Sequence, residues 1–142
     1  MAGLWRSRSR DAGLIARETL DLESRERIRA GRRVVARAVE VARQRCLDGR
    51  FSRAITVETF QDCAKDPVWA ADYRTYVKDD IFKHGNPLKG INREIGFRIR
   101  AAIGGHVETG ADGKPVLEKV LGEVIQSYTP MRSFDRKIVE AK

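Results

Sequence analysis

Two arginines and a phenylalanine stand on one side of the clearest helix that this sequence predicts, over residues 86–103. At about 100° per residue, Arg93, Phe97 and Arg100 share a face of that helix. Each guanidinium offers a planar fork of N–H donors that fits a phosphate or the edge of a guanine. The pattern suggests a nucleic-acid-binding surface. A solvated face, with Phe97 packed on a neighbouring segment, explains the same residues equally well.

Four more basic residues are candidates for the same role. Lys89 lies early in the same helix, and Lys114 follows a predicted turn at 110–113. Arg29 and Arg33 belong to the polar side of a long helix predicted over 14–47. A stripe of arginines on a long helix is more simply explained as a solvated face, so DNA contact by Arg29 and Arg33 is the less favoured interpretation.

The residues that catalysis or metal binding would need are sparse. His84 and His106 have no ligand-like spacing to each other or to Cys46 and Cys63, and neither a C-x-x-C nor an H-E-x-x-H pattern occurs. The glycine-rich stretch lacks the order of a phosphate-binding loop, and the acidic pair at 79–80 lacks a third ligand. We therefore expect no enzyme activity, no metal, no cofactor and no small-molecule substrate.

Composition limits the class of protein. The 142 residues fit one domain, and 28 Lys and Arg against 20 Asp and Glu give a net charge of +8, which attracts polyanions such as DNA. The first residues lack the apolar run of a signal peptide, and about 18 consecutive apolar residues occur nowhere. The sequence thus predicts a cytoplasmic protein with no membrane segment, in which both cysteines are buried thiols.

The N-terminal third predicts an arm and a long helix. Residues 1–13, rich in arginine and serine, are expected to be a disordered basic arm. The helix over 14–47 has one broad apolar side, made by Ile28, Val34, Val35, Ala38, Val39, Val41, Ala42 and Cys46. Ile28, Val35 and Ala42 repeat every seven residues, which raises the possibility of a homodimer through this helix.

The helices that follow have clear boundary signals. A short helix is predicted over 57–64, and Asp66 followed by Pro67 begins another that reaches about residue 80. The core-facing side of that second helix is Trp69, Tyr73, Tyr76, Val77 and Ile81. The helix over 86–103 ends at Gly104 and Gly105 and buries Leu88, Ile91, Ile95, Ile99, Ala102 and Ile103.

The C-terminal part predicts a β-hairpin. Residues 106–109 and 123–128 have the composition of strands, and the segment 110–113 that follows the first of them is a turn. Residues 116–122 fit either a helix or a strand, and Gly122 with the β-branched residues favours a strand. The last segment, 131–142, is expected to be a peripheral tail.

This order of elements over 54–130, with helices at 57–64, 67–80 and 86–103 followed by a hairpin, resembles a winged helix-turn-helix module. The fold class is then mostly α with a small C-terminal β-hairpin, in a single helical domain over 14–130. The resemblance implies a recognition helix at 86–103 in the DNA major groove and a wing at 110–114. We expect a double-stranded DNA-binding protein, such as a transcriptional regulator. The alternative is a non-enzymatic helical interaction or assembly module whose positive charge is incidental.

Overall fold

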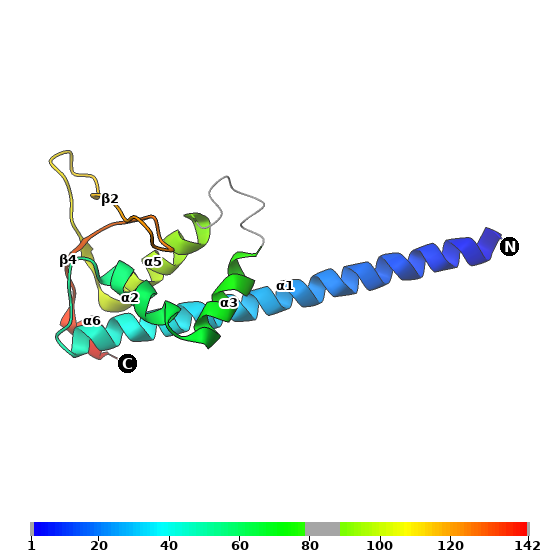
Figure 1. The fold of residues 1–142 in the computed structure, drawn as a ribbon, viewed down its shortest axis with the longest axis horizontal. Coiled ribbons are helices and arrows are strands. Elements are labelled where there is room, and N and C mark those ends of the chain that lie inside the picture. Colours follow the sequence, from blue (N-terminus) through cyan, green and yellow to red (C-terminus); the bar gives the residue numbers. More distant parts are fainter. Residues whose placement is uncertain (1, 79–88, 142) are drawn as a thin grey trace.

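The computed structural model describes residues 2–78 and 89–141, and most of these residues are helical. The helices are α1 (Ala2–Leu47), α2 (Ile55–Ala64), α3 (Pro67–Val77), α5 (Lys89–Ile103) and α6 (Arg136–Glu140). Four short strands form two antiparallel pairs near the C-terminus. Figure 1 shows α2, α3, α5 and α6 gathered around one end of α1. The prediction of a mostly helical fold with a small β component is confirmed.

Helix α1 ends at Leu47, as predicted, and Gly49 follows with a positive φ of 72°. The helix begins at Ala2, so residues 2–13 are helical where the sequence predicted a disordered arm. Physically, the segment contains no proline, and its alanine, leucine and arginine residues favour helix, so α1 can extend through it. In Figure 1 the N-terminal part of α1 projects well beyond the other elements.

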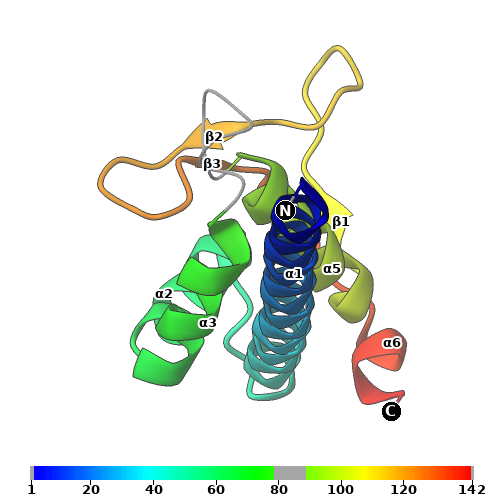
Figure 2. The same cartoon turned by 90° about the vertical axis from the view of Figure 1, so that its right-hand side faces the viewer.

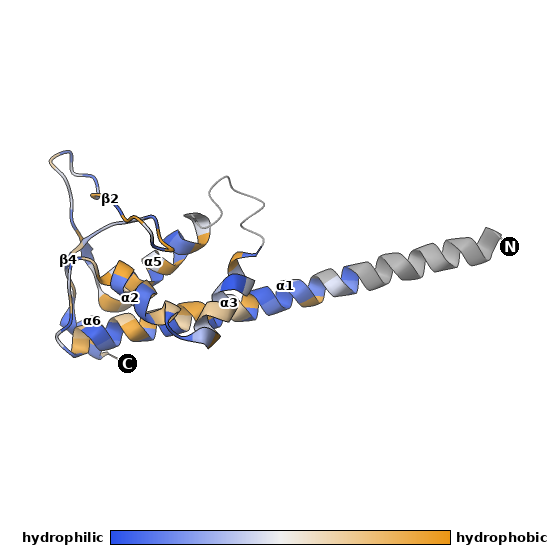
Figure 3. Ribbon diagram, viewed as in Figure 1, coloured by the Kyte–Doolittle hydropathy of each residue, from blue (hydrophilic) through white to orange (hydrophobic). Residues whose placement is uncertain are grey.

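The buried stripe of α1 has a spacing of four residues, made by Ala30, Val34, Ala38, Ala42 and Cys46. A four-residue step advances about 40° around a helix, whereas a seven-residue step retreats about 20°. The seven-residue repeat of Ile28, Val35 and Ala42 therefore does not follow the stripe. Ala42 lies at its centre, Val35 lies to one side of it, and Ile28 lies on the opposite side of the helix. Ile28 is 52% exposed, so the prediction that it lies on the buried side is wrong. Figure 3 shows apolar and polar positions alternating along α1 where the other helices adjoin it.

Helices α2 and α3 follow their boundary signals closely. Helix α2 begins at Ile55, two residues before the predicted start, and ends at Ala64. At the start of α3, Asp66 Oδ1 accepts a hydrogen bond from the Val68 N–H at 2.9 Å, which confirms the predicted cap. The aromatic side of α3 belongs to the core, as predicted, because Trp69 and Tyr73 are buried and Trp69 Nε1 donates to Val34 O at 3.1 Å. Residues 79–81, predicted to finish this helix and its stripe, lie outside the described residues.

Helix α5 confirms the predicted inward face, since Ile91, Ile95, Ile99 and Ile103 are all buried. Residues 86–88, which would begin the predicted helix, lie outside the described part of the chain. Gly104 ends the helix with a φ of 57°, and a Cβ at this position would stand 2.7 Å from atoms of the Asp135 and Ile138 side chains. Glycine is thus required there by both backbone conformation and space.

The strands pair differently from the prediction. Strand β1 (His106–Val107) pairs with β4 (Met131–Ser133), and β2 (Glu118–Lys119) pairs with β3 (Ser127–Tyr128). The expected pairing of 106–109 with 123–128 is therefore wrong. Residues 116–122 contain β2 and no helix, in line with the favoured interpretation. The chain reverses direction near Gly122, whose φ is 77°, and this brings residues 127–128 next to 118–119. Closing such a short loop costs little conformational entropy.

The segment 131–142 was predicted to be a peripheral tail, but the structure places part of it in the core. Met131 in β4 and Val139 in α6 are buried, and α6 contacts both α1 and α5. Asp135 Oδ1 caps α6 by accepting from the Lys137 N–H at 2.9 Å. Arg43 of α1 donates to Val139 O at 2.8 Å. The packed domain thus extends past residue 130, because the apolar side chains of Met131, Phe134 and Val139 pack against the core.

Candidate nucleic-acid interface

A groove of about 640 Å³ lies between the exposed face of α5, part of α2 and residues 107–131. In Figures 1 and 2 the β2–β3 pair lies on the side of α5 away from α1, so it forms a wall along that face. The lining residues are Thr56, Phe60, Asn92, Arg93, Gly96, Phe97, Arg100, Val107, Pro115, Leu117, Val124, Ile125, Gln126, Ser127, Tyr128, Thr129 and Met131. A volume of this size is in the range of ligand sites.

Three predicted site residues meet in this groove. The Arg93 Cζ atom lies 5.4 Å from the centre of the Phe97 ring, and the Arg100 Cζ atom lies 5.0 Å from it. These distances allow cation–π attraction, with one guanidinium a turn before the ring and the other a turn after it. Phe97 is 43% exposed. The ring therefore faces the groove, and the interpretation in which Phe97 is packed away on a neighbouring segment is not supported.

Neither groove arginine has a carboxylate partner within the described part of the chain. Arg98, on the same helix, pairs with Glu94 at 3.0 Å. The difference follows from the sequence, because positions three and four residues from Arg93 and Arg100 hold no Asp or Glu. No acidic residue is among the described residues that line the groove either. Among the residues that the structure describes, the groove lining therefore carries positive charge and no negative charge.

Carboxylates close to the groove wall are engaged by other groups. Tyr128 donates its hydroxyl to Glu118 at 2.8 Å, and Arg53 donates to both Glu118 and Glu108 at 2.8 and 2.7 Å. Hydrogen bonding to Arg53 holds the pKa of Glu108 below its usual value. Burial, together with the bond to Glu118, raises the pKa of Tyr128. Arg53 therefore offsets part of the negative charge of Glu108 and Glu118 near the groove.

Polar side chains tie the wall to the helices. Asn92 accepts from the Tyr73 hydroxyl at 2.6 Å and donates to Val124 O at 3.4 Å, so it links α3, α5 and the wall. Gln61 of α2 donates to Glu123 at 2.8 Å. The rim carries exposed apolar side chains as well, with Leu117 66% exposed. Sequence reasoning missed this wall, because its strands are two residues long and leave no periodic pattern.

The other predicted basic residues lie elsewhere. Lys114 is exposed beside the 110–113 turn and does not line the groove, while Lys89 begins α5 and its side chain is not described. Arg29 lies on α1, 3.9 Å from Glu26. Arg33 donates to both carboxylate oxygens of Asp72 at 2.9 Å, and this hydrogen bonding lowers the pKa of Asp72. Arg33 therefore holds α1 to α3, and its Nε and Nη2 donors are already in use.

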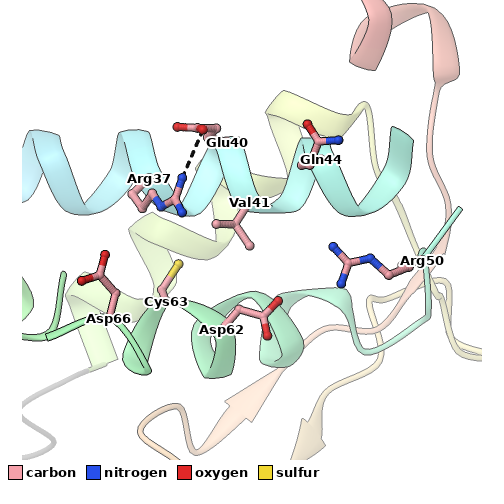
Figure 4. Close-up of a pocket in the computed structure, with 8 residues that line it drawn as sticks. All are labelled: Arg37, Glu40, Val41, Gln44, Arg50, Asp62, Cys63 and Asp66. Carbon is pink, nitrogen blue, oxygen red and sulfur yellow. Dashed lines mark hydrogen bonds and ion pairs between the residues drawn. The ribbon is translucent and has the colours of Figure 1, made fainter. Parts of the chain in front are cut away.

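A second, smaller hollow of about 260 Å³ lies between α1 and α2 and is called the α1–α2 cleft below. Figure 4 shows its lining, which is Arg37, Glu40, Val41, Gln44, Arg50, Asp62, Cys63 and Asp66. Its charges are of both signs, and Arg37 pairs with Glu40 at 3.1 Å. Burial raises the pKa of the Cys63 thiol to about 11, which keeps it protonated and unreactive at neutral pH. Both cysteines are free and buried, as the sequence predicted.

The described residues contain no group of three or more side chains placed to hold a metal ion. His84 and the acidic pair at 79–80 lie outside them. None of the helices within 2–78 and 89–141 has an apolar stretch long enough to cross a membrane. Comparison with protein-family models, with curated proteins and with solved structures finds no match for this chain.

Proposed function

We propose that this protein binds DNA through the groove face of α5, with Arg93 and Arg100 contacting phosphates. The observation that carries this proposal is the pair of guanidinium groups on one accessible face, with no carboxylate partner among the described residues and none lining the groove. A net charge of +8 adds a general attraction to polyanions. The planar donor fork of each guanidinium fits the oxygens of a phosphate.

The proposal includes a winged helix-turn-helix mode of binding. Helix α5 takes the place of the recognition helix, and residues 110–114 act as a wing that brings Lys114 near the DNA backbone. Lys89, in the first turn of α5, adds charge at the end of the same helix. A regulator of transcription would use such a contact, and the partner is double-stranded DNA.

The test is the salt dependence of binding to a DNA duplex. Each neutralised phosphate contributes a slope of roughly −0.9 to log affinity against log salt. Replacing Arg93 and Arg100 together with alanine is expected to flatten the slope by about two. The matched control is Arg25→Ala with Arg32→Ala, which removes the same charge from exposed positions on α1. Arg29 and Arg33 are a poorer control, since loss of Arg33 would also release Asp72.

Two outcomes would reject this proposal. Equal losses from the groove pair and the α1 pair would mean diffuse attraction with no specific face. Absence of measurable binding even at about 50 mM salt, where phosphate contacts are strongest, would remove duplex DNA as the partner.

A second candidate function is self-association through α1. Leu22 is 61% exposed and Ile28 is also exposed, and both precede Ala30, where the buried stripe begins. Because Leu22 and Ile28 lie about 120° apart around the helix, we infer that a second copy could cover Ile28, and not both side chains, in a homodimer. Sedimentation of Ile28→Asp beside the parent tests it, because Ile28, unlike Val35, does not pack against the protein's own core. A monomeric parent would exclude the dimer, and a dimer lost in the variant would support it.

A further inference from the structure

We infer that the α5 groove accommodates unpaired nucleotides, so that the DNA it prefers is single-stranded or locally melted. The inference rests on the proposed contact of Arg93 and Arg100 with DNA phosphates, and it replaces the duplex with an unpaired strand as the preferred form of DNA. Three properties of the groove support it: its charge, its flat stacking surfaces and its enclosed shape.

The charge fits a polynucleotide backbone. Arg93 and Arg100 are seven residues apart on α5, which is about 10 Å along the helix axis. They stand at either side of Phe97, with no acidic residue among the described lining residues. An extended strand that passes along the groove would meet one guanidinium and then the other, each able to pair with a phosphate.

The stacking surfaces fit unpaired bases. Single-stranded nucleic acids bind grooves that combine positive charge with aromatic rings, and bases stack on aromatic faces or on guanidinium planes. Arg93 and Arg100 each place a guanidinium over the Phe97 ring, so the three residues supply one ring and two guanidinium planes. In a duplex the base faces are already stacked within the helix and cannot use such a surface.

The shape favours a strand over a duplex. A recognition helix enters a major groove about 12 Å wide, so its contact face must stand clear of the rest of the protein. The face of α5 that carries Phe97 is instead walled by residues 107–131. Leu117 and Val124 on this wall are exposed apolar side chains, and contacts with phosphates would not cover them. The apolar faces of unpaired bases can pack against both. Ser127 and Thr129 add hydroxyl groups that can bond to base edges.

Fluorescence anisotropy with a labelled oligothymidylate, and with a duplex of equal length at the same salt, tests the inference. We expect tighter binding to the single strand. Phe97→Ala should weaken it by about 5- to 150-fold, the range for loss of one stacked base, and leave duplex binding nearly unchanged. Phe97→Trp should preserve binding, whereas Phe97→Leu, which keeps apolar bulk but removes the ring, should behave like Phe97→Ala. Val68→Ala, an exposed apolar change on α3 outside the groove, is the matched control.

The results separate this inference from the proposed function. Equal or tighter duplex binding, with no effect of Phe97→Ala on either DNA, overturns the inference and leaves the proposed function standing. No binding to either DNA rejects both.

Full affinity in Phe97→Leu would show that apolar bulk matters and stacking does not, which also overturns the inference. Displacement of the oligothymidylate by polyglutamate at equal charge would mean that the groove selects an acidic chain, and the inference would again fail. Thermal melting of each variant checks that it is folded.

Discussion

The α5 groove and the α1–α2 cleft are both lined by two arginines, yet their charges are balanced differently. The cleft sets Arg37 and Arg50 among Glu40, Asp62 and Asp66, and Asp62 is also held by Arg45 of α1 at 2.6 Å. The groove has two arginines and no acid among its described lining residues. An arginine count alone therefore does not identify a binding surface. The presence or absence of a nearby carboxylate distinguishes an arginine that holds the fold from one that is available to a partner.

The local sequence accounts for part of this contrast. Arg37 has Glu40 three residues later, on the same helical face, and the two side chains pair. Around Arg100 the corresponding positions are Gly96, Phe97, Ile103 and Gly104, which offer no acid. The spacing of α5 therefore gives Arg93 and Arg100 no acidic partner three or four residues away in their own helix.

The largest expected effect comes from the core beneath the groove. Ile95 is fully buried on the inner face of α5, and Ile95→Ala should reduce the free energy of unfolding by about 2–5 kcal/mol, the cost of removing apolar contacts and leaving a cavity. Urea denaturation measures the change, with Val68→Ala as a surface control. A loss below about 1 kcal/mol, at the level of ordinary surface changes, would mean that α5 is not anchored by its isoleucines and that the groove has no rigid floor.

The second effect tests the charges beside the cleft. The Arg45 side chain is only 12% exposed and donates to Glu58 at 2.7 Å and to Asp62 at 2.8 Å. Arg45→Met keeps most of the apolar length but leaves two carboxylates without this cation. We expect a loss of about 1.5–3 kcal/mol in urea denaturation, the range for hydrogen bonds to charged groups. A neutral result would show that these pairs contribute nothing and would weaken the contrast between the two hollows.

The groove arginines should contribute much less to stability. Within α5, Arg93 and Arg100 each place a guanidinium over the Phe97 ring, and an exposed cation–π contact is worth about 0.5–1 kcal/mol. The double alanine variant should therefore stay within about 1–2 kcal/mol of the parent while it loses DNA affinity. Denaturation and DNA titration of the same sample check both. A larger loss of stability would assign these arginines to the fold and remove the main support for the binding proposal.

The helices were predictable because their signals are local. The cap at Asp66, the stop at Gly104 and the isoleucines of α5 each depend on neighbours a few residues away, and the structure confirms them. The face carrying Arg93 and Arg100 follows from the same periodicity.

Features that depend on distant parts of the chain were not predictable in this way. The pairing of β1 with β4 joins segments more than 20 residues apart, and the burial of Val139 requires α1 and α5 to be in place. The engagement of Arg33 by Asp72, 39 residues away, likewise leaves no pattern in the sequence. The groove wall combines both difficulties, because it is distant from α5 and has very short strands.

The smallest expected effect concerns acid stability at the groove wall. Bonds from Arg53 hold the pKa of Glu108 below its usual value, as bonds from Arg33 do for Asp72. A carboxylate with a lowered folded-state pKa contributes stability that is present above its unfolded pKa, about 4.3 for Glu, and is lost as the pH falls through the folded value. Arg53→Gln should therefore lower the melting temperature slightly at pH 7 and make the decline of the melting temperature below about pH 4.3 shallower.

Because Arg53→Gln also leaves Glu118 unneutralised behind Tyr128, it should weaken DNA binding to a small extent. Identical melting curves for parent and variant from pH 7 down to pH 3 would show that the bonds from Arg53 to these acids do not stabilise the fold.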